Sequence, residues 1–395
     1  MTVACDAVFA KLSAMSFDDV IARRGSGSIK WDQKPNLDPF WVADMDFASP
    51  PEVLEALQNR VAHGVLGYAH PHDGLNEAVL TYLEQRHGAK EQLDSIVHLG
   101  GLVPALSLAA RAFGEPGDQV MTGTPVYPPF LGVSRDNEME TIKVPHVLFD
   151  DYRYTFDWKA MENSVSEKTR IFLLCNPQNP LGRCFTEDEI RQVSEFCLQY
   201  GLILVSDEIH CDLVLDEKAT PFFSCLNLPD EHRENLIVLQ SPSKTYNIAG
   251  MGYAYAVIPN RQLRRKFTNA KGHTSPEINC LAYYSAEAAY RYGEPWRQEL
   301  LAYLTKNRDT IVQMVSEELP EVKMPTMEAT YLAWMDCKPF GYANPAVHLE
   351  KKENLFVSDG AYFDSPQHIR FNFGCAHSRV LEGMEKVVRG LKTAE

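Results

Sequence analysis

The sequence has few basic residues and no long apolar segment, and each shortage excludes a class of protein. Lys and Arg number 38 against 53 Asp and Glu, which gives a formal net charge of −15 at pH 7. Binding along a nucleic-acid backbone needs clustered cations, so we expect no nucleic-acid partner. Uncharged stretches such as 95–110 are too short to cross a bilayer and contain glycine and proline. We therefore expect no membrane span.

Motifs for metal sites and disulfide frameworks are also lacking. The nine cysteines include no C-x-x-C pair, and the twelve histidines include no H-E-x-x-H. The odd number of cysteines favours a reducing compartment, and we expect no metal site. Residues 1–14 lack the apolar core of a secretion signal and are interpreted as a loose extension. We therefore predict a cytoplasmic protein.

The sequence does contain the alternation typical of an α/β protein. From about residue 51 to 285, short apolar runs alternate with amphipathic stretches, as helices over a mostly parallel sheet require. A helix is predicted over 186–200, where Thr186 and Glu189 have the spacing of a capping box. The strand candidates are nearly continuous apolar runs, which is typical of strands covered on both faces. They are 171–175, 202–206, 236–240 and 253–258.

The pattern changes after residue 286. A long amphipathic helix is predicted over 296–319, followed by strands punctuated by proline and a closing helix over 378–391. We find no repeat, low-complexity tract or flexible linker, so the parts are expected to pack directly. We predict three parts: an N-terminal segment (1–50) that packs with the small domain, a large domain (51–285) and a smaller α+β domain (286–395).

Three polar residues closely follow the first three strand candidates. They are Asn179, Asp207 and Lys244, separated by 28 and 37 residues. Each interval leaves room for a crossover and the next parallel strand. Ligands of open α/β sheets bind outside the carboxyl ends of the strands, so the three side chains can converge on one ligand. Taken singly, each has an ordinary interpretation as a turn or surface residue.

This set of side chains fits pyridoxal 5'-phosphate. The cofactor needs a lysine for its Schiff base and a carboxylate opposite its ring nitrogen, and Lys244 and Asp207 suit these roles. The amide of Asn179 can donate to the 3-hydroxyl. The phosphate needs amide and hydroxyl donors, and a helix N-terminus suits it. Candidates are the backbone amides of Gly100, Gly101 and Leu102, before an apolar run at 104–112, and the hydroxyls of Ser241 and Ser243.

Several longer motifs resemble those of a known family, the fold-type I pyridoxal-phosphate enzymes of aminotransferase class I/II. They are NPQNPLG (176–182), SDEIHCD (206–212), SPSKTYNIAG (241–250) and RFNFG (370–374). The resemblance extends from residue 17 to 391. It implies a large domain with a mostly parallel seven-stranded sheet covered by helices, together with a small C-terminal α+β domain. KWD (30–32), WVADMDF (41–47) and EATYLAWMD (328–336) resemble its cystathionine β-lyase branch, MalY/PatB.

The resemblance implies roles for further residues. Tyr127 would stack on the cofactor ring, and His210 would touch the cofactor. Arg370, together with Asn179, would bind the substrate carboxylate. Tyr68 would reach the phosphate of the neighbouring subunit, which implies a homodimer with shared active sites. Outside the family, Tyr127 is also compatible with a proline-flanked loop aromatic and Arg370 with a solvent-facing charge. The planar guanidinium favours a carboxylate site.

The implied activity is a C–S β-lyase that releases a thiol, pyruvate and ammonia from an amino-acid thioether such as cystathionine. Many aminotransferases of the class have Tyr and Arg where this chain has His210 and Gly252, and both differences resemble the lyase branch. The motif GCAHS (374–378) lacks a proline expected there. An aminotransferase is the first alternative, because it needs the same cofactor residues. A regulatory binding protein is the second, because some relatives of the branch bind a transcription activator, although the intact cofactor residues argue against it.

Overall fold

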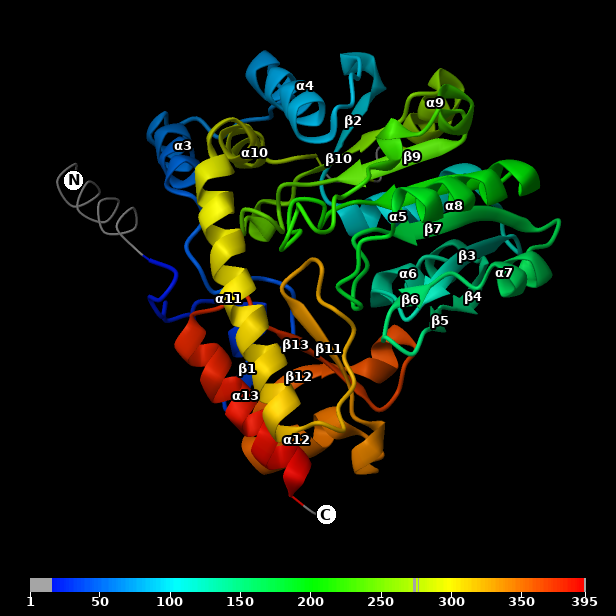
Figure 1. The fold of residues 1–395 in the computed structure, drawn as a ribbon. Coiled ribbons are helices and arrows are strands. Elements are labelled where there is room, and N and C mark those ends of the chain that lie inside the picture. The colour runs from blue at the N-terminus through cyan, green and yellow to red at the C-terminus, as the bar shows by residue number, and fades with distance from the viewer. Residues whose placement is uncertain (1–15, 273–274, 276, 394–395) are drawn as a thin grey trace.

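A computed structural model describes residues 16–272, 275 and 277–393. Its largest sheet contains β2 (Ile96–Leu99), β3 (Gln119–Thr124), β4 (Glu140–Pro145), β7 (Thr169–Cys175), β8 (Ile203–Asp207), β9 (Leu236–Gln240) and β10 (Ala254–Val257). The strand order is β2-β10-β9-β8-β7-β3-β4 (Figure 1). All neighbours are parallel except β10, which runs antiparallel to β2 and β9. The predicted α/β fold with a mostly parallel seven-stranded sheet is confirmed. The extension expected over 1–14 lies outside the described residues.

Helices cover both faces of this sheet. On one face lie α5 (Leu102–Phe113), α6 (Pro128–Gly132) and α9 (Arg261–Lys271), and on the other α4 (Asp73–His87), α7 (Trp158–Ser164), α8 (Glu187–Tyr200) and α10 (Cys280–Tyr292). Successive residues of β7 alternate between the two cores: Ile171 and Leu173 belong to one, Phe172 and Leu174 to the other. A strand buried on both faces needs apolar residues at every position, which explains the continuous apolar runs in the sequence.

The capping box predicted at Thr186 is present. The hydroxyl of Thr186 accepts a hydrogen bond from the N–H of Glu189 at 3.3 Å, and Glu189 Oε2 accepts one from the N–H of Thr186 at 2.8 Å. Two N–H groups without partners in the helix are thereby satisfied. Gly201 ends α8 with a φ of 66°, a left-handed conformation that glycine adopts without steric strain.

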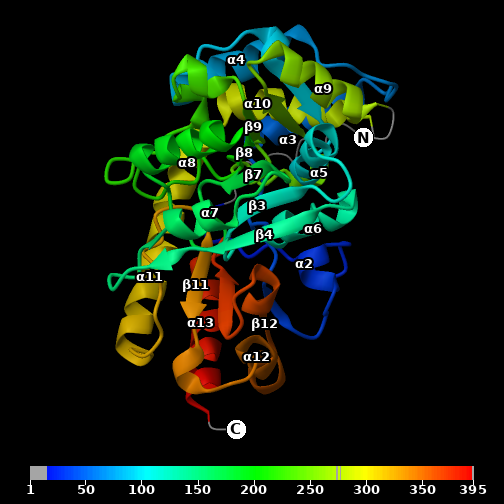
Figure 2. The same ribbon diagram turned by 90° about the vertical axis from the view of Figure 1, so that its right-hand side faces the viewer.

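A second, four-stranded sheet is built from both ends of the chain. Its strands are β1 (Asp38–Phe40), β11 (Leu332–Asp336), β12 (Leu355–Asp359) and β13 (His368–Asn372), in the order β1-β12-β13-β11. It packs with α11 (Glu294–Glu318), α12 (Pro345–Glu353) and α13 (His377–Lys392) around one apolar core. Figures 1 and 2 show α11 running from beside the large sheet to the far end of the small one. The predicted long helix and closing helix are both found, with ends within two residues.

The division into three parts stays a prediction, but the structure bears on each boundary. β1 pairs in parallel with β12, so part of the N-terminal segment adds an edge strand to the small sheet. The boundary placed after residue 285 falls inside α10, which packs against α3 (Pro51–Ala62) and α4. Smaller elements are α2 (Ile29–Asp32) and the hairpin of β5 (Val147–Leu148) and β6 (Tyr154–Thr155).

Two further features of the structure bear on the expectations about membrane spans and cysteines. Within the described residues, we find no helix that combines the length and apolar character needed to span a bilayer. The eight cysteines in this part of the chain are free and buried. Burial raises the pKa of thiols such as Cys197, so these residues act as small apolar core groups.

The capping box gives a test of local stability. Thr186→Ala removes the acceptor for the N–H of Glu189, and we expect it to lower the free energy of unfolding by about 1 kcal/mol. Denaturant titration followed by far-UV circular dichroism measures this change. Thr310→Ala, in the middle of α11, is the control and should be neutral or slightly stabilising, because alanine is the better helix former. Equal stability of the two variants would contradict the assigned cap.

Candidate active site

The carboxyl ends of β7, β8 and β9 lie side by side, and one cavity opens beyond them. Asp207 is the last residue of β8, and Cys175, at the end of β7, is its register partner. Asn179 and Lys244 lie in the turns after β7 and β9. All three line a cavity of about 260 Å³. The structure therefore brings together the three polar side chains that the strand pattern placed at one sheet edge.

The same cavity collects most of the other predicted site residues. Its lining includes Gly100, Gly101, Leu102, Tyr127, His210, Ser241 and Ser243. Arg370 lines an adjoining cavity of about 520 Å³, which shares Ala43, Tyr127 and Lys244 with the first. Tyr68 is fully exposed and lies outside both linings. Its predicted place in a neighbouring subunit's site stays a prediction.

The N-terminus of α5 forms one end of the first cavity. Gly101 is its N-cap, and the N–H groups of the first turn have no acceptors within the helix. Gly252 closes the same end with a φ of 65°, and a Cβ atom there would lie 3.3 Å from the carbonyl oxygen of Gly100. A side chain at position 252 would crowd the backbone at the N-terminus of α5. Free amides at the positive end of a helix dipole suit a phosphate group.

Lys244 is half-buried, and its Nζ donates a hydrogen bond to the carbonyl oxygen of Ala43 at 2.6 Å. Burial lowers the pKa of Lys244 to about 8. The charge of Arg370 acts in the same direction, and the carboxylates of Asp44 and Asp207 oppose it. About a tenth of this amine is therefore unprotonated at pH 7, far more than for an ordinary lysine, and the unprotonated form is the one that acts as a nucleophile or a base.

Asp207 is buried, and its Oδ1 accepts a hydrogen bond from the N–H of Ile209 at 3.0 Å. Burial raises the pKa of Asp207 to about 7, although this N–H and the charge of Lys244 favour the ionised form. A protonated nitrogen placed against this carboxyl would hold it ionised, because an opposite charge lowers a carboxyl pKa. The site therefore fits a ligand with a basic ring nitrogen.

Arg370, on β13, is a buried cation surrounded by neutral acceptors. Nη1 donates to Asn179 Oδ1 at 2.9 Å, and Nη2 donates to the carbonyl oxygen of Trp41 at 2.7 Å and to Ser358 Oγ at 3.1 Å. Among the described residues, its Nε has no hydrogen-bond partner and no carboxylate forms an ion pair with it. Burial lowers the pKa of Arg370 to about 10, so it stays protonated at neutral pH. An uncompensated buried guanidinium favours a carboxylate ligand.

His210 and Tyr127 complete the lining. His210 is buried, and its Nδ1 has no partner among the described residues. Burial, with the charges of Lys244 and Arg370, lowers the pKa of His210 to about 3, so the ring is neutral. Tyr127 is the N-cap of α6 and lines both cavities, which distinguishes it from a simple loop aromatic. Its stacking on a ring stays a prediction.

Sequence reasoning missed the backbone acceptors that hold these side chains. The carbonyl oxygen of Ala43 accepts from Lys244 and also from the hydroxyl of Tyr331 at 3.0 Å. That of Trp41 accepts from Arg370. Both carbonyls belong to the WVADMDF segment (41–47), for which the sequence gives only a family resemblance. A carbonyl group has the same chemistry in every residue, so the side chains there give no sign of this role.

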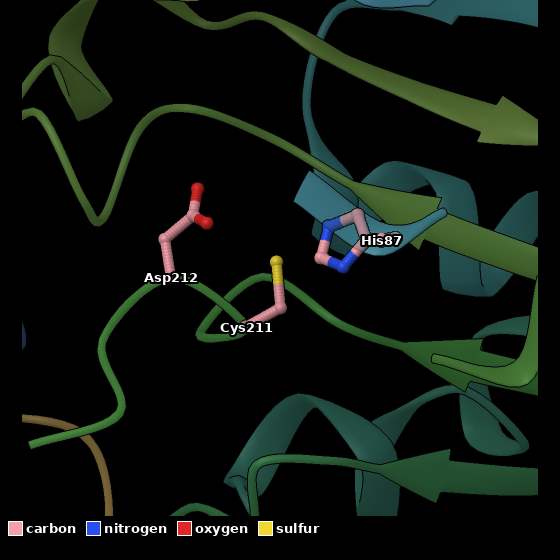
Figure 3. Close-up of side chains that lie close together, drawn as sticks. All are labelled: His87, Cys211 and Asp212. Atoms are coloured by element: carbon pink, nitrogen blue, oxygen red, sulfur yellow. The ribbon is translucent and has the colours of Figure 1, made fainter. Parts of the chain in front are cut away.

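Among the residues that the structure describes, one group of potential metal ligands is found, and two of its members directly follow His210 in the chain. Ligand atoms of His87, Cys211 and Asp212 lie within 4.8 Å of one another, at the end of α4 and in the loop after β8 (Figure 3). Asp212 accepts hydrogen bonds from the hydroxyl of Tyr82 and from Arg86 Nε, both at 2.8 Å. Burial raises the pKa of Cys211 well above its usual value, so it stays a neutral thiol. This arrangement fits a hydrogen-bond network that fixes the loop, because Arg86 supplies the positive charge.

Comparison with known proteins gives consistent results. Residues 40–389 match the model of the family described as aminotransferase class I and II. The chain is similar to cystathionine beta-lyase PatB of Bacillus subtilis, with 36% identity over 95% of this chain and 100% of PatB. It also resembles the crystal structure of OvoB (TM-score 0.92, 36% identity, 96% and 100% coverage). Cystalysin from Treponema denticola, whose structure contains a pyridoxal 5'-phosphate cofactor, is similar too (TM-score 0.91, 31% identity, 95% and 98% coverage).

The charges around Lys244 give a test of the site's electrostatics. In protein prepared without pyridoxal phosphate, acylation of Lys244 should be half-maximal near pH 8, as measured by peptide mass spectrometry across pH. Arg370→Met should move this midpoint upward, because it removes a charge that lowers the lysine pKa, and Asp207→Asn should move it downward. Shifts in the same direction in both variants would contradict the described geometry.

Proposed function

The chain belongs to the aminotransferase class I and II family, and on this basis we propose that it is a pyridoxal-phosphate-dependent C–S β-lyase acting on amino-acid thioethers. One observation carries the proposal. Lys244, Asp207 and Asn179 line a single cavity, and Lys244 and Tyr127 also line an adjoining cavity that contains Arg370 and has room for a substrate side chain. The similarity to PatB and cystalysin over nearly the whole chain supports both the reaction and the cofactor.

The residues present fit the cofactor. Lys244 would form the covalent bond to it, and Asp207 would face the ring nitrogen. Asn179 Oδ1 already accepts from Arg370, which leaves Nδ2 as the donor for the ring hydroxyl. The amides at the start of α5 and the nearby Ser243 would hold the phosphate. When bound, pyridoxal phosphate supplies an electron sink that stabilises negative charge at the substrate Cα.

The chain's own residues then account for the remaining chemistry. Arg370 binds the substrate carboxylate and orients Cα. Lys244, which is a free amine again once the substrate amine has displaced it from its covalent bond, removes the α-proton. The Cβ–S bond breaks, and its electron pair leaves with the sulfur, which takes up a proton to give the thiol. One water hydrolyses the three-carbon remainder to pyruvate and ammonia, so no oxidant or keto acid is consumed. Tyr127 and Pro128 supply apolar wall to the cavity beside Lys244.

An aminotransferase would use the same cofactor residues, but two positions favour the lyase. His210 and Gly252 stand where many aminotransferases of the class have Tyr and Arg. Gly252 lies against the carbonyl of Gly100 in a left-handed conformation, so a longer side chain there would meet this backbone. A purely regulatory binding protein is disfavoured, because the set of ionisable residues that the chemistry needs is intact.

We also propose a cytoplasmic homodimer with shared active sites. The loop before α4 carries the exposed apolar residues Val65, Leu66 and Tyr68, and Val61 is exposed on the adjacent α3. An apolar surface of this kind is expected at a contact between subunits. It would bring Tyr68 to the phosphate end of the partner's cavity. The free, buried cysteines support a reducing compartment.

The reaction type can be decided with L-cystathionine. We expect the protein reconstituted with pyridoxal phosphate to release pyruvate and free thiol without any added keto acid, measured with a coupled dehydrogenase and a thiol reagent. Lys244→Ala should lose nearly all turnover and the visible absorbance band of the lysine-bound cofactor. Strict dependence on a keto acid would instead indicate an aminotransferase, and full turnover in Lys244→Ala would remove the lysine from its assigned role.

Shared active sites predict complementation between two inactive variants. Tyr68→Phe damages the partner's site, and Lys244→Ala damages its own, so a heterodimer of the two has one intact site and one doubly damaged site. The purified heterodimer should recover about half of the wild-type turnover, well above either homodimer. Activities that merely average those of the two homodimers would show that Tyr68 acts within its own subunit.

A further inference from the structure

The cavity of about 520 Å³ that contains Arg370 is also lined by two charged side chains that take no part in the proposed reaction. Arg370 and Lys244 line the part that holds the carboxylate and the amine. Lys34, in the loop after α2, and Glu350, on α12, line it as well, and their Nζ and Oε2 atoms form an ion pair of 2.5 Å. The side chains are 38% and 31% exposed. The proposed chemistry uses neither residue.

An aromatic wall connects the ion pair to the carboxylate site. Arg370 Nη2 donates to the carbonyl of Trp41 at 2.7 Å. The ring of Trp41 stacks on Phe356 with centroids 4.9 Å apart and an angle of 25° between the planes. Lys34 Nζ in turn lies 4.3 Å from the centre of the Phe356 ring. Because Arg370, this wall and the ion pair all line one cavity of about 520 Å³, a ligand held at Arg370 can extend along the wall toward Lys34 and Glu350.

The aromatic wall and the ion pair are complementary to different parts of a ligand. Trp41, Phe356, Val357 and Ala346 offer apolar surface, which suits methylene groups and a thioether sulfur. A partly exposed ion pair contributes little to stability, so opening it for a ligand is inexpensive. A zwitterionic end restores both interactions, with its carboxylate on Lys34 and its ammonium on Glu350. A group with one charge leaves one of the two residues unpaired.

We propose that Lys34 and Glu350 are specificity-determining residues: they bind the zwitterionic end of a leaving group, and so favour thioethers whose departing thiol is itself an α-amino acid over thioethers that release an uncharged thiol. This inference rests on the proposed function and assigns to it two residues that contact the substrate far from the reacting atoms. Asp359, the other acidic residue of the lining, does not compete for the ammonium. Its two oxygens accept hydrogen bonds from Asn344 Nδ2 at 2.6 Å and from the N–H of Ala361 at 2.9 Å.

The test compares two substrates that differ at the far end. L-Cystathionine releases an α-amino-acid thiol, whereas S-ethyl-L-cysteine releases an uncharged thiol too short to reach the pair. In the holoenzyme, Lys34→Met and Glu350→Gln should each lower the ratio of kcat/KM for cystathionine to kcat/KM for S-ethyl-L-cysteine roughly tenfold, about the effect of one charge-assisted hydrogen bond. The loss should appear mainly as a higher KM for cystathionine.

A matched control is the ion pair of Lys392 and Glu318, which joins α13 to α11 at 2.7 Å away from both cavities. Lys392→Met should leave the ratio unchanged. If one of the two subsite variants fails to fold, as judged by thermal unfolding and cofactor absorbance, the other still decides the question. Turnover of both substrates with an unaltered ratio in the variants would overturn the subsite alone. Absence of pyruvate from either substrate with wild-type protein would overturn the proposed function, and this inference with it.

Discussion

The parallel alignment of β7, β8 and β9 is the constraint on which the site depends. Their carboxyl ends lie at one edge, so residues that are 28 and 37 positions apart in the chain line one cavity. The side chain of Glu208, the residue after β8, stabilises this edge. It accepts hydrogen bonds from Ser224 Oγ at 2.7 Å, from the N–H of Cys225 at 2.8 Å and from Gln240 Nε2 at 3.1 Å. A buried carboxylate with this many donors fixes the end of β8, and with it Asp207.

The N-terminal segment completes the site and connects the two sheets. Residues 41–47 supply the carbonyl oxygens that bind Lys244 and Arg370. Lys244 follows β9 of the seven-stranded sheet, whereas Arg370 lies on β13 of the four-stranded sheet. The segment is in turn held by the buried Lys30, whose Nζ donates to Asp46 Oδ2 at 2.8 Å. Although burial opposes it, the charge of Lys30 lowers the pKa of Asp46, so the Asp46 carboxylate stays ionised. This contact gives KWD (30–32) and WVADMDF (41–47) one physical role between them.

The sequence predicted those features for which the type of side chain depends on its surroundings in the fold. The continuous apolar runs predicted β7, β8 and β9, and the Thr186 capping box predicted the start of α8. Asn179, Asp207 and Lys244 were found from their positions after these strands. The acceptors at Ala43 and Trp41 were not predictable, because a backbone carbonyl is independent of residue type. The subsite pair was missed for another reason: Lys34 and Glu350 lie 316 positions apart, and each is an ordinary surface charge in the sequence.

The charges of the site are coupled in a way that links binding to proton transfer. The charge of Arg370 lowers the pKa of Lys244. A substrate carboxylate that pairs with Arg370 cancels much of this charge, so the proton affinity of the lysine rises when the substrate binds. A protonated ring nitrogen against Asp207 acts in the opposite direction, because it neutralises a carboxylate that raises the lysine pKa. A substrate carboxylate bound at Arg370 would therefore both orient Cα and make Lys244 a stronger base toward the proton on that carbon, at the step where the proposed reaction needs a base.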